Sequence, residues 1–230
     1  MGKNDEALDT LRKAVRINPT EPHLTMSLGS ALSREFRTDE AIQVYWRAFE
    51  KSEELDDKTS LTQKLTELYQ QLNQFDKLVD RLRRDQREES KRREMTICLA
   101  QAHQTAGDFG TARQELESLL STDTRDTNLL QQLSKLCQAS SDTQDAINYQ
   151  RQLAEIAPGH ETEYPLAKML QSAGDVEAAS EIFVRLTRRE ENPWRLLKSL
   201  DSLMKQQSFD SVIAITEPLL SESRLSLIHI

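Results

Sequence analysis

Apolar residues recur along the chain in groups spaced three and four residues apart, which is the spacing of one face of an α-helix. Leu28 and Leu32 form one such group, and Ala41 and Tyr45 form the next. Short polar stretches separate the groups, and several of them contain a turn-forming residue such as Gly107. The pattern predicts pairs of amphipathic helices joined by tight turns, and therefore an all-α protein.

The helix pairs repeat in register along the chain. In the second helix of each pair, one position returns at steps of 34, 37, 34, 34, 33 and 33 residues, and a mostly bulky position follows it by four. In the first helix, a column of Leu keeps the same period, and a smaller side chain follows each Leu. The columns are Ala7, Ala41, Leu78, Ala112, Ala146, Ala179 and Val212; Leu11, Tyr45, Leu82, Leu116, Gln150, Phe183 and Thr216; and Leu28, Leu65, Leu99, Leu133 and Leu166.

The residue between the two helices of a pair is the expected helix stop. Gly2, Asn73, Gly107 and Gly174 occupy this slot, where a left-handed backbone ends a helix. The other units have Phe36, Ser141 and Gln207 there, so the signal is weaker in those units. The longer step of 37 residues is expected to lie in an extended acidic connection over residues 52–58.

These columns resemble the tetratricopeptide repeat, a 34-residue helix–turn–helix motif. The unit with Leu28-Gly29, Leu32, Ala41, Tyr45 and Ala48 carries the resemblance best, although the usual Trp of the first helix is missing. The resemblance implies an α-solenoid of stacked helix pairs, wound as a right-handed superhelix with a concave groove lined by the first helices. Each pair then buries its apolar face only against its neighbours.

The register predicts one solenoid over residues 1–230. It is expected to contain a second half-repeat at 1–21, repeats at about 22–58, 59–92, 93–126, 127–159 and 160–192, and a degenerate repeat at 193–230. The chain opens at an inter-helix turn, and its tail, Leu225–Ile230, lacks a polar capping face. We therefore expect a fragment of a longer protein, or a chain with a defective C-terminus.

Composition and charge narrow the function. Leu is twice as frequent as Val and Ile together, which favours helices. The net charge of −8 argues against nucleic acid or anionic lipid as the main partner. No apolar run is long enough to cross a bilayer. The two cysteines and the absence of a secretory signal favour a cytoplasmic location.

Side chains that could do chemistry are scattered. Cys137 and His103 share an apolar column, so both are expected in the core, and Cys98 has no nearby base to activate it. Trp46 and Trp194 are expected to pack between helices. No motif for a catalytic centre, a metal site or a cofactor appears, so we predict none of the three. The basic segment 81–93 is interpreted as an exposed helix end, with an anion-binding patch as the alternative.

The groove of the resembling family binds extended peptides, and its helical phase predicts which residues line it here. The candidates are rich in glutamine and lysine: Met26, Ser30, Gln63, Lys64, Glu67, Gln101, Gln104, Gln131, Gln132, Lys135, Gln138, Lys168 and Gln171. Amide side chains can hydrogen-bond a peptide backbone, but they also suit a solvated helix face. The Lys/Asn/Arg constellation that grips chaperone tails is absent, so Hsp70- and Hsp90-type tails are not expected as partners.

The leading hypothesis is a non-catalytic scaffold that binds a peptide or partner protein in the groove. One alternative is an interaction arm of a larger enzyme, or of a secretion or assembly component, lying outside these residues. A second alternative is RNA binding by related helical repeats, which needs a basic groove and is disfavoured by the acidic charge.

Overall fold

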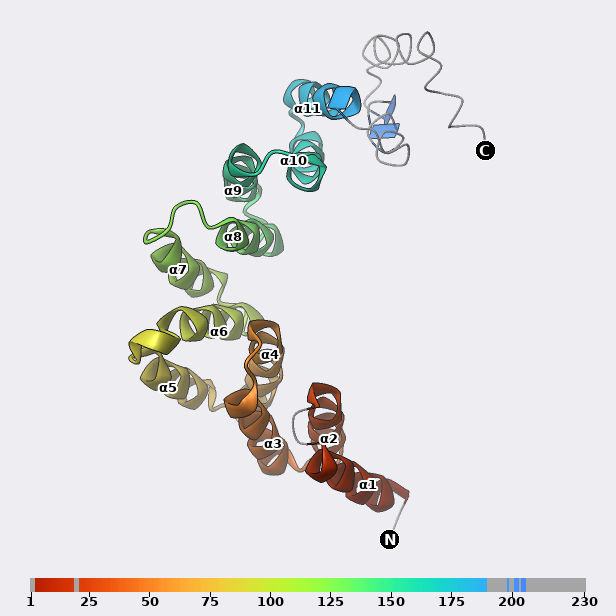
Figure 1. Ribbon diagram of the computed structural model, residues 1–230, viewed down its shortest axis with the longest axis vertical. Coiled ribbons are helices and arrows are strands. Elements are labelled where there is room, and N and C mark those ends of the chain that lie inside the picture. The colour runs from red at the N-terminus through yellow and green to blue at the C-terminus, as the bar shows by residue number, and fades with distance from the viewer. Residues whose placement is uncertain (1–2, 19–20, 190–197, 199–200, 203, 206–230) are drawn as a thin grey trace. The chain divides into compact units, whose positions relative to one another are not determined.

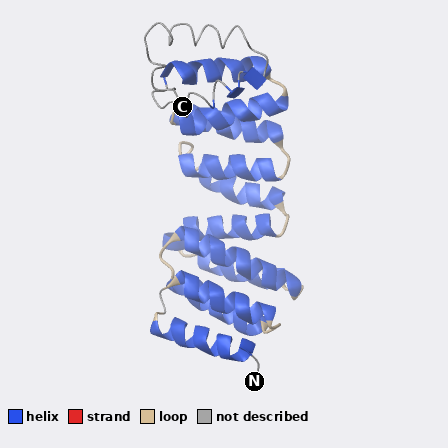
Figure 2. Cartoon of the chain, turned by 90° about the vertical axis from the view of Figure 1, so that its right-hand side faces the viewer, coloured by secondary structure: helices blue, strands red, loops and turns tan. Residues whose placement is uncertain are grey.

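The structure is a computed structural model that describes residues 3–18, 21–189, 198, 201–202 and 204–205. Within these residues it contains helices joined by short loops and no strand (Figures 1 and 2). The helices are α1 Lys3–Ile17, α2 Pro22–Arg34, α3 Thr38–Lys51, α4 Leu55–Gln71, α5 Phe75–Gln86, α6 Arg92–Thr105, α7 Phe109–Leu120, α8 Thr127–Ala139, α9 Thr143–Ile156, α10 His160–Ala173 and α11 Val176–Arg189, with a short 3-10 turn, η1, at Glu89–Lys91. The predicted degenerate repeat at 193–230, including Trp194 and the tail, lies outside the described residues.

The chain divides into two compact units, Met1–Ser121 and Thr122–Ile230. In the first unit, α2 packs on α3, α4 on α5 and α6 on α7, while α1 packs on α2. In the second unit, α8 packs on α9, α9 on α10 and α10 on α11. The even-numbered helices α2 to α10 are called first helices below, and the odd-numbered helices are called second helices. The predicted all-α, helix-paired fold is confirmed within each unit.

The small and large columns meet inside each helix pair. Gly29 of α2 lies under the ring of Tyr45 of α3, and a methyl group at Gly29 would come within 2.3 Å of that ring. In the second unit, the hydroxyl of Ser134 donates to the side-chain amide oxygen of Gln150 at 3.3 Å. The small residue of the first helix therefore makes room for the large residue of its partner. A polar member of one column is matched by a polar member of the other.

The turns between paired helices share one backbone geometry. The slot residues are left-handed in every described pair: φ is 57° at Phe36, 53° at Asn73, 84° at Gly107, 65° at Ser141 and 88° at Gly174. The N–H of the next residue donates five positions back, to the carbonyls of Leu32, Tyr69, His103, Cys137 and Leu170, at 2.8–3.0 Å. This is the Schellman closure of a helix end. Phe36 and Ser141 adopt it without glycine, although these two residue types are only a weak sign of a helix stop.

The extra residues of the 37-residue step lie in a helix, so their predicted place in a loop is wrong. Helix α3 ends at Lys51 and α4 begins at Leu55, which makes α4 17 residues long. Asp56 and Asp57 lie in its first turn, where the helix dipole favours negative charge. The hydroxyl of Ser60 also donates to the Asp56 carbonyl at 2.8 Å. Asp56 and Asp57, which were predicted to lie in a solvated connection, therefore begin a helix.

Candidate partner-binding surfaces

All of the predicted groove residues lie on first helices. Met26 and Ser30 are on α2, Gln63, Lys64 and Glu67 on α4, Gln101 and Gln104 on α6, Gln131, Gln132, Lys135 and Gln138 on α8, and Lys168 and Gln171 on α10. Gln63, Gln131, Lys135 and Gln138 are exposed, and the others are half-buried. In the first unit, α2, α4 and α6 pack in succession, so their candidates belong to one stack of helices.

Most hydrogen bonds and ion pairs of these candidates stay within one helix. Lys64 pairs with Glu67 at 2.9 Å. The amide of Gln101 donates to the Thr105 hydroxyl at 3.1 Å. Lys168 donates to Gln171 at 2.6 Å. Such pairs three or four residues apart stabilise a helix by only about 0.2–0.5 kcal/mol. These side chains can therefore change conformation around a partner at little cost in free energy.

Cys137, His103 and Trp46 are buried, as predicted, and Cys98, which was not predicted to be buried, is buried too. The thiol of Cys98 is fully enclosed, and burial raises its pKa to about 12, so it stays protonated and unreactive at neutral pH. Cys137 is also buried. The ring of His103 packs edge-on against Phe75, with its Nδ1 3.3 Å from an oxygen of Asp108. Trp46 is buried between helices, as expected.

The basic segment 81–93 is resolved into separate roles. Arg83 and Arg84 lie in the last turn of α5, as the helix-end interpretation predicts. Arg81 pairs with Glu50 of α3 at 2.5 Å, and Arg83 pairs with Glu115 of α7 at 3.1 Å. These two arginines link neighbouring second helices, which uses part of the charge that an anion-binding patch would need.

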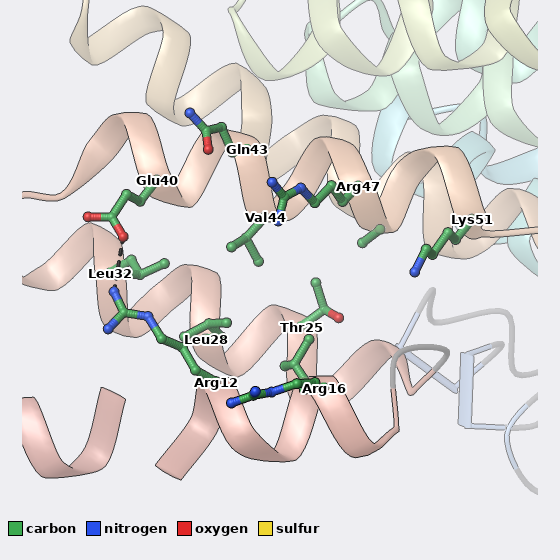
Figure 3. Close-up of a pocket in the computed structure, with 12 residues that line it drawn as sticks. Arg12, Arg16, Thr25, Leu28, Leu32, Glu40, Gln43, Val44, Arg47 and Lys51 are labelled. Atoms are coloured by element: carbon green, nitrogen blue, oxygen red, sulfur yellow. Dashed lines mark hydrogen bonds and ion pairs between the residues drawn. The ribbon is translucent and has the colours of Figure 1, made fainter. Parts of the chain in front are cut away.

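A cleft that the sequence analysis missed lies between α1 and α3, with α2 as its floor. Its volume is about 460 Å³. Leu28, Leu32 and Thr25 of α2 form the floor, and Val15 and Val44 add apolar walls. Figure 3 shows Arg12 and Arg16 on one side of the cleft and Arg47 and Lys51 on the other. We call this the Arg47 cleft.

The charges of the Arg47 cleft are unevenly compensated. Glu40 accepts from Arg37 at 2.6 Å and from Arg12 at 3.0 Å. These contacts, the Arg37 bond first, hold the pKa of Glu40 below its usual range, so it stays ionised and is already shared by two cations. Arg16, Arg47 and Lys51 form no ion pair within the described part of the chain.

A second cleft of about 510 Å³ lies between α9 and α11, over α10. Its charged lining residues are Arg151, Glu155, Glu163, Glu181 and Arg185. Oε1 of Glu163 accepts from Nε of Arg185 at 3.0 Å and from Nη2 at 2.8 Å. We call this the Arg185 cleft. Its arginines face acids supplied by the chain itself.

Two kinds of feature are absent from the described residues. None of their helices combines the length and the apolar content needed to cross a membrane. No group of three or more His, Cys, Asp or Glu side chains among them is placed to hold a metal ion.

No protein-family model matches the sequence, and no curated protein matches it. Among solved structures, the chain is similar to PilW, a type IV pilus biogenesis factor, with 14% identity and a TM-score of 0.49 over 86% of this chain and 90% of that one. It is also similar to a tetratricopeptide repeat protein from Parabacteroides merdae, with 15% identity and a TM-score of 0.42 over 96% and 87% of the two chains. A third is TTC0263, a thermophilic TPR protein of Thermus thermophilus, with 15% identity and a TM-score of 0.43 over 80% and 100%.

Helix pairing, repeat register and the shared Schellman turns decide the fold class. The chain has a tetratricopeptide-like fold. The predicted resemblance is therefore confirmed at the level of the fold.

Proposed function

We propose that this chain is a non-catalytic protein-interaction scaffold whose first helices bind an extended peptide or a partner protein. The supporting observation is that glutamine and lysine side chains recur on successive first helices and have mainly local partners. Gln101 and Lys64, for example, pair with residues of their own helices. A partner can displace such contacts without disturbing the packing between helices.

The chemistry of these side chains suits a peptide backbone. An amide offers two donors and one acceptor oxygen, so Gln63, Gln101 and Gln104 can satisfy both the N–H and the C=O groups of an extended chain. Because such contacts ignore the partner's side chains, specificity would come from neighbours such as Met26. The same surface would serve an interaction arm of a larger enzyme or assembly equally well.

The test is a selection of random dodecapeptides displayed on phage against the full chain, followed by fluorescence-anisotropy titration of the selected peptides. The groove variant is Gln63→Ala/Gln101→Ala/Gln104→Ala. We expect its affinity for these peptides to fall about tenfold or more, equivalent to the loss of about 1.4 kcal/mol of binding free energy.

The matched control is Gln114→Ala/Gln152→Ala, which removes exposed glutamines from second helices α7 and α9. This control is expected to bind as the unmodified chain does, and circular dichroism checks that both variants stay helical. A selection that yields no binder, or binders indifferent to the groove variant, contradicts the proposal.

A further inference from the structure

The Arg47 cleft and the Arg185 cleft are built from equivalent positions of the repeat. When the Leu columns of α2 and α10 are aligned, Thr25 corresponds to Glu163. When the Ala columns of α3 and α11 are aligned, Arg47 corresponds to Arg185. Each pair of equivalent residues lines its own cleft. The two clefts are therefore two versions of one surface and can be compared residue by residue.

In the Arg185 cleft, the floor supplies the acid. The carboxyl group of Glu163 is almost fully enclosed, with the residue only 5% exposed, and its Oε1 receives two hydrogen bonds from Arg185. A buried carboxylate is stable only when a cation or hydrogen-bond donors compensate it. The cleft geometry therefore accommodates one carboxylate beneath this arginine.

In the Arg47 cleft, the equivalent acid is missing. Thr25 occupies the floor position, is only 4% exposed, and its hydroxyl makes no hydrogen bond within the described part of the chain. At equivalent floor positions of α4 and α6, the hydroxyls of Thr62 and Thr96 donate to carbonyls of their own helices. Figure 3 shows Thr25 between Arg16 and Arg47. The cleft thus contains, beneath uncompensated cations, a threonine hydroxyl that has no hydrogen-bond partner in the described part of the chain.

The arrangement of the cations is unfavourable without a ligand. Arg12 and Arg16 are four residues apart on α1, and Arg47 and Lys51 are four residues apart on α3. Like charges at this spacing repel each other and destabilise a helix by a few tenths of a kcal/mol. Arg16, Arg47 and Lys51 thus form a local cluster of positive charge on a chain whose net charge is −8. An anion bound in the cleft would relieve this repulsion.

We infer that the Arg47 cleft binds an acidic segment of a partner protein, with one carboxylate above Thr25 and between Arg16 and Arg47. This carboxylate takes the place that Glu163 takes in the Arg185 cleft. The guanidinium of Arg47 pairs with it as Arg185 pairs with Glu163, and the Thr25 hydroxyl donates from below. The cations of the cleft lie on the second helices α1 and α3, and the cleft shares no lining residue with the candidates of the proposed scaffold function.

The walls and surroundings identify the occupant as a short acidic peptide segment. Leu28, Leu32 and Val44 offer apolar contact that a phosphate ion or a nucleic-acid backbone would not use, whereas an apolar side chain beside the carboxylate would. Next to Lys51, a second hollow of about 390 Å³ is lined by Glu21, Glu53, Glu54 and Asp57. These acids repel a continued acidic run, so the bound stretch of negative charge is short.

The test uses the full chain and a displayed library of random dodecapeptides, selected in parallel on three proteins. Thr25→Glu supplies the floor acid internally and copies the Arg185 cleft, and Arg47→Ala removes the pairing cation. We expect one group of peptides to be recovered from the unmodified chain and lost from both variants. This group is expected to be enriched in Asp or Glu beside an apolar residue, with affinity about tenfold weaker on each variant.

Arg151→Ala is the matched control, because it removes one exposed arginine from the Arg185 cleft, at the position equivalent to Arg12. It is expected to leave the acidic peptides bound. Because Arg47 is exposed, Arg47→Ala is expected to fold normally. It therefore tests binding even if Thr25→Glu disturbs folding. Circular dichroism and thermal unfolding establish the folded state of each protein.

The reciprocal variant Glu155→Arg/Glu163→Thr/Glu181→Gln gives the Arg185 cleft the residues of the Arg47 cleft at those positions. It is expected to bind two acidic peptides per chain instead of one. The inference is overturned if no acidic group is lost on Thr25→Glu and Arg47→Ala, or if inorganic phosphate or an RNA oligonucleotide binds there in place of the peptides. If peptides are lost on the α4 and α6 variant but none is lost on Thr25→Glu or Arg47→Ala, only this inference is overturned and the scaffold function stands.

Discussion

The guanidinium carbon of Arg81 lies 3.7 Å from the centroid of the Trp46 ring, and the indole Nε1 of Trp46 donates to the hydroxyl of Tyr69 at 3.1 Å. Arg81 also pairs with Glu50 at 2.5 Å. In the repeat register, Trp46 corresponds to Arg12, and Arg81 corresponds to Val44. The positions that line the Arg47 cleft are therefore taken, one repeat later, by a stacked aromatic and cation that join α3, α4 and α5.

Replacing Arg81 should weaken this junction measurably. Arg81→Ala removes the stacking and the ion pair, and we expect a loss of about 1 kcal/mol in the free energy of unfolding. Arg81→Lys keeps the charge but loses the planar stacking, so it should recover only part of that loss. Urea unfolding followed by circular dichroism measures both. Equal stability of Arg81→Ala and the unmodified chain would show that the stacking contributes nothing.

Gly29 should behave opposite to an ordinary helical glycine. A helix-interior Gly→Ala change usually stabilises by about 1 kcal/mol. At Gly29, the added methyl group would meet the Tyr45 ring at 2.3 Å, and we expect Gly29→Ala to destabilise by about 1–3 kcal/mol. The double variant with Tyr45→Leu should lose less than the sum of its single changes, because the clash is removed. Additive losses in thermal unfolding would contradict the close packing.

The turn at Phe36 should tolerate, and favour, glycine. Phe36 has φ 57° and is 94% exposed, so its ring offers little packing to offset a left-handed backbone. We expect Phe36→Gly to stabilise the chain by about 1 kcal/mol, and Gly107→Ala, in the equivalent slot, to destabilise it by a similar amount. Changes of the same sign at the two positions would argue against a shared turn geometry.

Acid should weaken the start of α7. Hydrogen bonds from Thr111, followed by the nearby His103, lower the pKa of Asp108 below 3.8. Because the folded pKa is lowered, its stabilisation is complete above the ordinary pKa and is lost as the pH falls through the folded value. We expect Asp108→Asn to be less stable than the unmodified chain at neutral pH.

This difference in unfolding free energy should shrink as the pH falls below the ordinary value of 3.8 toward the lowered pKa at which the folded Asp108 carboxylate is protonated. Urea titrations of both proteins across that range measure it. Asp123→Asn, which changes an acid in the connection before α8, serves as the control. A stability difference that is independent of pH would show that the ionised Asp108 carboxylate does not stabilise the start of α7.

The sequence predicted what the repeat imposes on every unit. Ala41 and Tyr45, and their counterparts, could be placed because a fixed period puts them at the same contact in each helix pair. The turn at Phe36 was harder to predict, since its closure uses backbone groups and any side chain can occupy the slot at some conformational cost. The start of α4 was missed because acidic residues suit both a loop and a first helical turn.

The Arg47 cleft was missed for a different reason. Its cations come from two helices that are separated in sequence, and neither Arg12 nor Arg47 lies in a segment of unusual charge. Residues 81–93, in contrast, have a high local density of charged residues. The signal lay in the register, where Thr25 stands in the place of Glu163. The missing acid becomes visible only when the repeats are aligned and the two clefts are compared at Thr25 and Glu163.

In both units, the helix contacts link elements that are adjacent or two apart in sequence. Among the helices α1 to α11, these contacts leave no far-reaching link that would fix the number of units. Duplicating or deleting about 34 residues would add or remove one module and leave the remaining interfaces unchanged. Length itself is therefore a variable that evolution or protein engineering can adjust without redesigning the interior.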